Sequence, residues 1–205
     1  MNLGSLVSRF LALLLFIASL PFLLVVLIAI KLEDGGPLIF AHKRAGKGKK
    51  PFTMYKVRTM VVGAEKMKEA LLARNEADGP VFKIRQDPRH TKVGRLLAHS
   101  GLDEIPQLVN IVKGEMAFVG PRPLPIEEAE RVPQKYKLRF SVLPGITSSW
   151  VVKGSHVLTF KEWMAHDLQD VRELNLISRL SILLGTLLVI AREIYQKLTN
   201  LAKKM

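Results

Sequence analysis

Apolar residues form one unbroken run near the start of the chain. Residues 10–30 carry no charge, and as an α-helix of about 1.5 Å per residue they extend roughly 31 Å, close to the thickness of a bilayer's hydrocarbon core. The run is too long for the apolar part of a signal peptide, and no small-residue cleavage motif precedes Lys31. The pattern therefore predicts a helix that enters a membrane.

A proline, Pro21, lies near the middle of this run. Proline lacks a backbone N–H and clashes with the preceding turn, so it predicts a kink or a break, and the Ser19 hydroxyl can bond to a carbonyl left free there. The basic residues downstream predict that this flank is cytoplasmic; they are Lys31, Lys43, Arg44, Lys47, Lys49 and Lys50. Arg9 indicates, more weakly, that the other flank is also cytoplasmic. A spanning helix and a re-entrant helix, which dips into the bilayer and returns, both fit this pattern.

After the apolar run, the pattern changes to short elements separated by glycine and proline. Residues 33–37 break the first helix, and residues 38–42 and 52–57 have the pattern of two strands around a basic, glycine-containing turn, so a β-hairpin is expected. Further helices are predicted over residues 61–77, 92–99, 102–113 and 125–137. The predicted fold class is α+β, mostly helical, with a small β-hairpin.

The last predicted helix, from residue 176 onward, carries its apolar residues on one stripe. The stripe consists of Leu176, Leu180, Leu183, Leu184, Leu187, Leu188 and Ala191. An amphipathic helix of this kind either packs its stripe against a protein core or lies in the headgroup plane of a membrane. The sequence pattern leaves both arrangements open.

Composition and charge narrow the range of partners. A net charge of +13 at pH 7 favours nucleic acid, anionic lipid or phosphate-bearing substrates. Aromatic residues make up only 7% of the chain and no helix-turn-helix pattern is found, which argues against nucleic acid. The chain has no cysteine, which excludes disulfides, thiolate catalysis and cysteine-based zinc sites. Its histidines are scattered without metal-binding spacing.

Asp103 and Glu104 form an adjacent carboxylate pair at the start of a predicted helix. Most such pairs are solvated helix starts, where negative charge is favourable. Here arginines on or beside loops accompany the pair in the sequence: Arg58, Arg85, Arg89, Arg95 and Arg122. Carboxylates in a basic pocket bind Mg²⁺ through oxygen or attack an electrophile, and arginines hold phosphate oxygens. The pair therefore becomes the candidate reactive centre.

These residues lie within a series of ordered blocks that resemble the bacterial sugar transferases, which are monotopic polyprenyl-phosphate sugar phosphotransferases. The blocks are Gly36-Pro37, Pro51-Phe52, residues 55–60, Val81-Phe82-Lys83, Asp87-Pro88-Arg89, Thr91, Val93-Gly94-Arg95, residues 102–108, Asn110, and residues 113–116, 118–124 and 144–147. The strongest reads Leu-Asp-Glu-Ile-Pro-Gln-Leu over residues 102–108. The proline-broken apolar run is part of the same resemblance, which thus covers nearly the whole chain.

The resemblance implies a two-step reaction that starts polysaccharide synthesis. Asp103 attacks the β-phosphate of a UDP-sugar, UMP leaves, and the phosphate of a polyprenol, usually undecaprenol, then takes the phosphosugar from the enzyme. Glu104, together with Asp103, is expected to hold Mg²⁺. Arg122 is expected to contact phosphate, and Arg58 and Arg89 are further candidates for that role.

The same resemblance implies a place for the protein at the cytoplasmic face of the bacterial inner membrane. Residues 1–32 are then a re-entrant membrane helix, and residues 33–205 are a cytosolic catalytic domain that ends in an interfacial amphipathic helix. Membrane lipid is an expected contact, nucleic acid is not, and a homodimer is left open.

The chain departs from the family pattern at several positions. Leu20 stands where a serine usually precedes the proline, and Ala98 stands where an arginine usually precedes the aspartate by five residues. Ser148-Ser149 and Ser155 occupy positions where the family has Gly-Trp and a second arginine. The candidates to supply the missing positive charge are Arg85, Arg89 and His99. The alternative function is a non-catalytic, membrane-anchored scaffold or lipid-binding relative.

Overall fold

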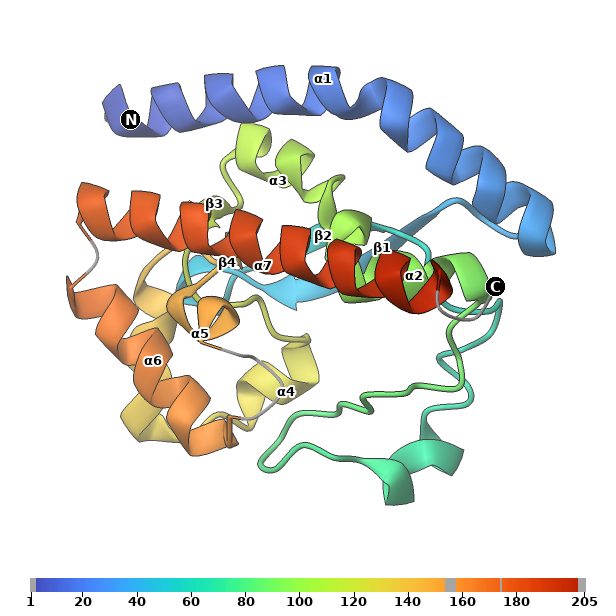
Figure 1. Cartoon of the computed structure of the whole chain (residues 1–205). Coiled ribbons are helices and arrows are strands. Elements are labelled where there is room, and N and C mark those ends of the chain that lie inside the picture. The colour runs from blue at the N-terminus through green and yellow to red at the C-terminus, as the bar shows by residue number, and fades with distance from the viewer. Residues whose placement is uncertain (1–2, 154–157, 174, 203–205) are drawn as a thin grey trace.

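The computed structural model describes residues 3–153, 158–173 and 175–202, and is mostly helical (Figure 1). The chain begins with the long helix α1 (Leu3–Asp34) and ends with the long helix α7 (Leu176–Ala202). Between them, in order, come β1 (Ile39–Ala45), β2 (Pro51–Val57), α2 (Lys92–Ser100), α3 (Gln107–Lys113), β3 (Ala117–Val119), α4 (Ile126–Glu130), β4 (Gly145–Thr147), α5 (Ser149–Val152) and α6 (Phe160–Glu173). The predicted mostly helical fold with a small hairpin is confirmed.

The hairpin pairs β1 with β2 in antiparallel register, from Ile39 opposite Val57 to Ala45 opposite Pro51. The connecting turn needs the left-handed backbone that its glycine supplies, since Gly48 has φ 64°. The strands β3 and β4 form a second, parallel pair, which was not predicted. This pairing brings Val119 opposite Thr147, so it joins two segments that the predicted helix over 125–137 had separated.

The predicted helix over 61–77 is wrong. The segment forms turns and a short 3₁₀ helix (Glu69–Arg74) with hydrogen bonds between residues three apart, such as Met67 N–H to the Ala64 carbonyl. The apolar residues at helical spacing in this segment are Ala64, Met67, Leu71 and Leu72, and of these only Ala64 is buried, whereas Met67 and Leu72 are exposed. An isolated short helix gains little without tertiary packing, so this face does not sustain one.

The predicted helix over 125–137 is also wrong as a single element. The chain makes α4 over Ile126–Glu130 and then a separate 3₁₀ helix (Gln134–Ser141). Pro133 separates the two, because it has no N–H to donate and disfavours helical backbone at the residue before it. The helix over 92–99 is confirmed as α2. The stretch 102–113 becomes a 3₁₀ turn followed by α3.

Helix α1 contains Pro21 yet continues to Asp34, and it bends along its length in Figure 1. Proline is the usual cause of such a kink. Because Pro21 has no N–H, the carbonyl of residue 17 lacks its helical donor. The Ser19 hydroxyl does not replace that donor, since it donates instead to the Phe16 carbonyl at 2.7 Å. The predicted kink is therefore present without a break in the helix.

One face of α1 packs on the protein and the rest is apolar and exposed. Ala12 joins Met54 and Ile111 in one core cluster, and Leu23 and Ile30 join a second. The exposed apolar residues of α1 include Phe10, Leu14, Ile17, Leu24 and Val25. Among the described residues, α1 is the one helix long and apolar enough to cross a membrane.

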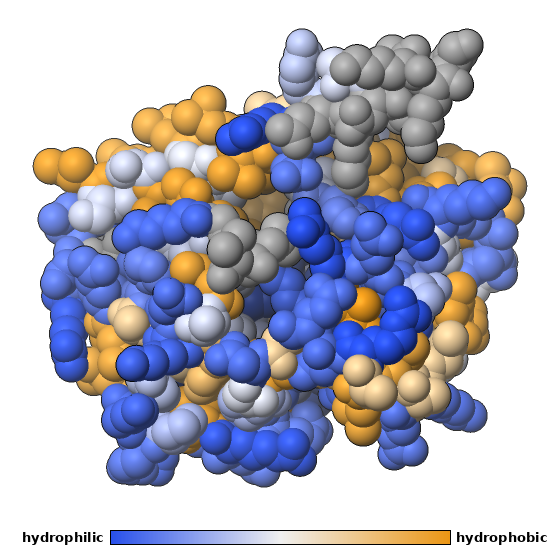
Figure 2. Space-filling view, turned by 60° about the horizontal axis from the view of Figure 1, so that its bottom comes forward, coloured by the Kyte–Doolittle hydropathy of each residue, from blue (hydrophilic) through white to orange (hydrophobic). Residues whose placement is uncertain are grey.

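Helix α7 also turns its leucines outward. Leu180, Leu184 and Leu188 are 52%, 63% and 72% exposed, so packing of the whole stripe in a core is ruled out. The Thr186 hydroxyl instead faces the protein and bonds to that of Thr147 at 2.7 Å. In Figure 2, hydrophobic side chains gather along the upper edge of the molecule and hydrophilic ones cover most of the face towards the viewer. This distribution is compatible with membrane association.

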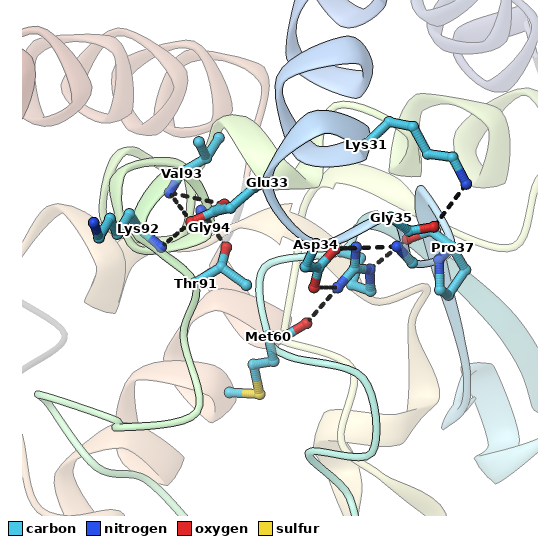
Figure 3. A network of polar contacts seen from close by, with 12 residues as sticks. Lys31, Glu33, Asp34, Gly35, Pro37, Met60, Thr91, Lys92, Val93 and Gly94 are labelled. Carbon is cyan, nitrogen blue, oxygen red and sulfur yellow. Dashed lines mark hydrogen bonds and ion pairs between the residues drawn. The ribbon is translucent and has the colours of Figure 1, made fainter.

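A polar network ties the end of α1 to the unit beneath it (Figure 3). The Glu33 carboxylate accepts from the backbone N–H groups of Lys92 (2.6 Å) and Val93 (3.2 Å), and so caps the start of α2. Asp34 pairs with the Arg58 guanidinium, which also donates to the carbonyls of Pro37 and Met60. The end of the apolar helix is thereby fixed to both α2 and the end of β2.

The Arg58 hydrogen bonds lower the pKa of Asp34 from 3.8 to about 2. Because the folded pKa lies below the unfolded value, the stability that this pair contributes is present above about pH 4 and is lost as the pH falls through about 2. The tie between α1 and the rest of the chain is thus intact at neutral pH.

Replacing Arg58 by glutamine is expected to lower the free energy of unfolding by about 2–3 kcal/mol, because several charge-assisted hydrogen bonds are lost at a buried position. Thermal unfolding of the full chain in detergent measures the change. The matched control is Arg95→Gln, at an exposed position on α2, which is expected to change stability by no more than about 0.5 kcal/mol. Equal losses in the two variants would contradict the proposed tie.

Candidate active site

The carboxylate pair lies on a 3₁₀ turn (Leu102–Glu104) between α2 and α3. Gly101 adopts the left-handed conformation, with φ 72°, which ends α2 and lets the chain turn at once. Pro106 then precedes α3 at its amino end, where its missing N–H costs nothing. The local sequence therefore fixes the pair at a junction of two helices, with Asp103 only 1% exposed.

Lys56 and Arg122 flank the two carboxylates. The Lys56 ammonium is 2.7 Å from Asp103 Oδ2 and 3.6 Å from Glu104 Oε1. The Arg122 guanidinium donates to Glu104 Oε1 at 3.3 Å. The result is a continuous row of alternating charge contributed by β2, the 3₁₀ turn and the loop after β3.

Lys56 was not among the residues predicted for the site. It lies on the same face of β2 as Phe52 and Met54, both of which are buried, because alternate residues of a strand share a face. A lysine at an inward position is unusual unless a carboxylate pairs with it. That position was the available signal in the sequence.

Burial and charge act in opposite directions on the two carboxyl groups. Burial raises the pKa of Asp103, against the charge of Lys56, and the neighbouring Glu104 raises it further. Burial also opposes ionisation of Glu104, but the charges of Arg122 and Lys56 outweigh it, and the pKa of Glu104 lies below its ordinary value. The site thus moves the pKa values of its two acids apart, and Glu104 is the more firmly ionised.

A shallow pocket opens beside the pair. It is lined by Met54, Glu104, Gln107, Arg122, Pro123, Gly145 and Ile146. The Gly120–Pro123 loop that carries Arg122 is held by two backbone hydrogen bonds, from Gly120 N–H to Thr147 (2.9 Å) and from Gly145 N–H to Pro121 (3.0 Å). A Cβ on Gly145 would lie 2.1 Å from the Gly120 nitrogen, so this close approach requires glycine.

A buried ion pair also holds this loop in place. The Arg139 guanidinium donates to Asp167 at 2.8 Å and to the Arg122 carbonyl at 2.8 Å. Both side chains of the pair are almost fully buried, and burial raises the pKa of Asp167 to about 6. Arg139 therefore fixes the backbone from which Arg122 reaches Glu104.

Arg44 is a second cation that sequence reasoning did not place in the site. It donates from Nη1 to the Pro123 carbonyl at 3.4 Å. Burial, together with the nearby charge of Arg122, lowers its pKa to about 10. One guanidinium group, that of Arg122, thus lines the pocket, and a second, that of Arg44, bonds to the Pro123 carbonyl in its wall, which favours an anionic ligand.

The other predicted phosphate-binding residues have partners elsewhere. Arg58 binds Asp34, and Arg89 binds both oxygens of Asp87, so each of these guanidinium groups already has a carboxylate. Arg85 is exposed. His99 is exposed too, and its Nδ1 lies 2.7 Å from the Arg95 carbonyl. Ala98 lies half-buried on α2, and Ser155 lies outside the described residues.

The carboxylate pair is also the candidate site for a metal ion. Among the described residues, no three His, Asp or Glu side chains gather as a metal site would require. The site offers two hard oxygen donors, Asp103 and Glu104, on adjacent residues. Mg²⁺ is commonly bound by one or two carboxylates, with substrate phosphates and water completing its shell, so the pair fits a magnesium ion shared with a phosphate ligand.

Comparison with known proteins agrees with the pattern of blocks. The sequence model of the bacterial sugar transferase family matches residues 3–193. The galactosyl transferase CpsE of Streptococcus agalactiae is 40% identical over 159 residues, covering 77% of this chain and 35% of CpsE. The undecaprenyl-phosphate galactose phosphotransferase of Salmonella typhimurium is 36% identical over 167 residues, covering 78% and 34%.

A third relative is the UDP-glucose:undecaprenyl-phosphate glucose-1-phosphate transferase of Caulobacter vibrioides. It is 34% identical over 177 residues, which cover 81% of this chain and 61% of that protein. The chain thus spans about a third of the length of the first two relatives and less than two thirds of the third.

Replacing Arg139 by methionine is expected to lower the free energy of unfolding by about 3–5 kcal/mol, because Asp167 is left buried without its cation. The double variant Arg139→Met/Asp167→Leu removes both charges and is expected to recover most of this loss. Denaturant unfolding of the two variants measures the difference. A double variant no more stable than the single one would contradict this account of the ion pair.

Proposed function

Because the chain belongs to the bacterial sugar transferase family, we propose that it transfers a sugar-1-phosphate from a UDP-sugar to a polyprenyl phosphate such as undecaprenyl phosphate, with release of UMP. The names of the Salmonella and Caulobacter relatives support this reaction class. The observation that carries the proposal is the buried carboxylate pair flanked by Lys56 and Arg122. This arrangement suits a reaction in which negative phosphate must approach a negative nucleophile.

In the first step, an Asp103 carboxylate oxygen attacks the β-phosphorus of the UDP-sugar. A bond forms from that oxygen to phosphorus, the bond from phosphorus to the bridging oxygen breaks, and UMP leaves with that oxygen. Lys56, at 2.7 Å, favours the ionised form of Asp103 against the effect of burial and reduces its repulsion of the incoming phosphate. Arg122 presents positive charge at the pocket, where the phosphate oxygens bind.

In the second step, a phosphate oxygen of the polyprenyl phosphate attacks the same phosphorus. The bond to Asp103 breaks and the carboxylate is restored, so the products are polyprenyl-diphospho-sugar and free enzyme. Each step exchanges one phosphorus–oxygen bond for another and needs no external acid or base. A single carboxylate therefore serves both halves of the reaction.

We assign the magnesium ion to Glu104 with a contribution from Asp103. The lowered pKa of Glu104 keeps it ionised and ready to ligate. When bound, Mg²⁺ neutralises charge that develops on the phosphoryl oxygens. Gln107 and the Arg122 guanidinium line the same pocket and orient the phosphate oxygens.

The anchor brings these groups to the depth of the lipid phosphate. The bend of α1, its exposed apolar side chains and the basic residues on its downstream flank support a re-entrant helix with both ends at the cytoplasmic face of the inner membrane. The exposed leucines of α7 support a helix in the headgroup plane. A soluble nucleotide and an isoprenoid phosphate meet only at that interface.

Replacing Asp103 by asparagine is expected to abolish both UMP release and the covalent adduct, because an amide lacks the nucleophilic carboxylate. Purified full-length protein is incubated with Mg²⁺, undecaprenyl phosphate and a panel of UDP-sugars, and intact mass after incubation with donor alone reports the adduct on residue 103. Glu127→Gln, at an exposed position on α4, is the matched control and is expected to keep full activity.

Two outcomes would overturn the assignments. Normal turnover by the asparagine variant would remove Asp103 as nucleophile. Failure of the parent protein to release UMP from any UDP-sugar, with vesicle binding retained, would favour the non-catalytic alternative.

Replacing Lys56 by glutamine is expected to lower kcat/KM by about 10²-fold at pH 7, since a charge that stabilises the phosphoryl transfer is lost. It also removes the cation that opposes the raised pKa of Asp103, so the acidic limb of the pH profile moves to higher pH. Rates of UMP release between pH 5 and 9 measure both effects. Lys43→Gln, on the exposed face of β1, is the control, and an unshifted acidic limb in the Lys56 variant would contradict the role of Lys56.

A further inference from the structure

A cavity of about 190 Å³ lies behind the loop that carries Arg122. Its walls come from β3, from the loops at residues 120–121 and 142–143, and from the facing ends of α6 and α7. Well-packed interiors contain few voids larger than a water molecule, and this cavity exceeds by more than tenfold the space that one water needs. The cavity is therefore too large to be a simple packing defect, and it can hold a small polar group.

Two charged side chains line the cavity, Arg179 from α7 and Asp170 from α6. The Arg179 guanidinium donates to the Val119 carbonyl at 3.2 Å, and among the described residues no carboxylate forms an ion pair with it. Asp170 is 5% exposed and accepts from the Ser149 N–H at 3.0 Å. The cavity thus contains a half-buried cation with donors to spare.

Arg179 lies on the same part of α7 as several exposed apolar residues. The neighbouring residues Leu176, Ile177 and Leu180 are 72%, 80% and 52% exposed, whereas Arg179 faces inward to β3. In Figure 1 this first part of α7 lies against the β3 and β4 region. If the exposed leucines enter the apolar layer, Arg179 lies at the depth of lipid headgroups.

We propose that this cavity binds the phosphate head of a membrane lipid through Arg179, with the lipid's apolar chain lying along the exposed leucines of α7. A guanidinium group presents several N–H donors in a planar fork that matches phosphate oxygens. The cavity is distinct from the pocket beside Asp103, because no described residue lines both, although the segments 120–123 and 142–146 each contribute residues to the two sites. The proposal does not depend on the transfer reaction, and either a phospholipid or a polyprenyl phosphate has the required chemistry.

A purely structural role for Arg179 predicts a different result for its substitution. In that case Arg179 only holds the end of β3 through the Val119 carbonyl, and its loss changes stability but not lipid binding. The lipid proposal also predicts the direction in which Asp170 affects lipid binding, because its negative charge repels a phosphate in the same cavity. Asp170→Asn keeps an oxygen to accept from Ser149 and removes the charge, so it is expected to tighten lipid binding.

The test titrates the full chain in neutral detergent with three probes: dihexanoyl phosphatidic acid, farnesyl phosphate and inorganic phosphate. Native mass spectrometry counts the bound molecules and gives a Kd for each. Arg179→Gln is expected to weaken binding of at least one lipid probe by about tenfold or more, which corresponds to one charge-assisted contact. Val171→Phe narrows the cavity without a change of charge and is expected to weaken binding as well.

The matched control is Arg192→Gln, which removes the same charge from an exposed position further along α7 and is expected to leave each Kd unchanged. Equal weakening by the Arg179 and Arg192 variants would show general attraction to a basic helix and overturn the proposal. Inorganic phosphate that binds as tightly as both lipid probes would also overturn it. The lipid probe with the greater sensitivity to Arg179 identifies the source of the phosphate.

Because Arg122 offers a second cation for phosphate, the titration is repeated with Arg122→Gln. Lipid binding that survives in this variant and still depends on Arg179 supports the cavity. Lipid binding that disappears with Arg122 alone belongs to the pocket beside Glu104 and overturns the proposal.

Discussion

The structure depends on the fixed attachment of an apolar helix to the charged unit that carries the carboxylate pair. The last turn of α1 supplies two carboxylates, and each is used by a different element: Glu33 caps α2, and Asp34 binds Arg58 at the end of β2. The same two elements place the carboxylate pair and its lysine, because the 3₁₀ turn follows α2 and Lys56 precedes Val57 on β2. The position of α1 is thus coupled to the site through a few short hydrogen bonds.

The site itself illustrates how burial is balanced by charge. Asp103 and Glu104 are adjacent like charges in a poorly solvated position, which is unfavourable unless cations lie nearby. Lys56 and Arg122 provide that compensation from two different parts of the chain. Arg122 depends in turn on Arg139 and on the parallel pairing of β3 with β4, so the apparently minor second sheet is what brings the loop to the pair.

Local patterns predicted the elements that are determined locally. Alternation marked the hairpin, glycine and proline marked the limits of α2 and α3, and adjacent carboxylates among arginines marked the reactive centre. Lys56 and Arg139 were missed because their roles depend on partners from distant segments. The segment 61–77 has helical spacing but lacks a surface on which to pack, and spacing alone cannot show that lack. The direction of the leucine stripe on α7 was likewise open until its partners were known.

The packing of α1 has a consequence for the boundary between anchor and enzyme. Ala12 is completely buried against Met54 and Ile111, and Ile30 lies against Val57 and Leu97, so the apolar helix forms part of the core under the site. Cutting the chain after Asp34 would uncover these side chains and remove the cap of α2. We therefore expect a fragment that lacks α1 to lose part of the packing that supports the carboxylate pair. The apolar helix and the unit that carries the carboxylate pair thus share one hydrophobic core.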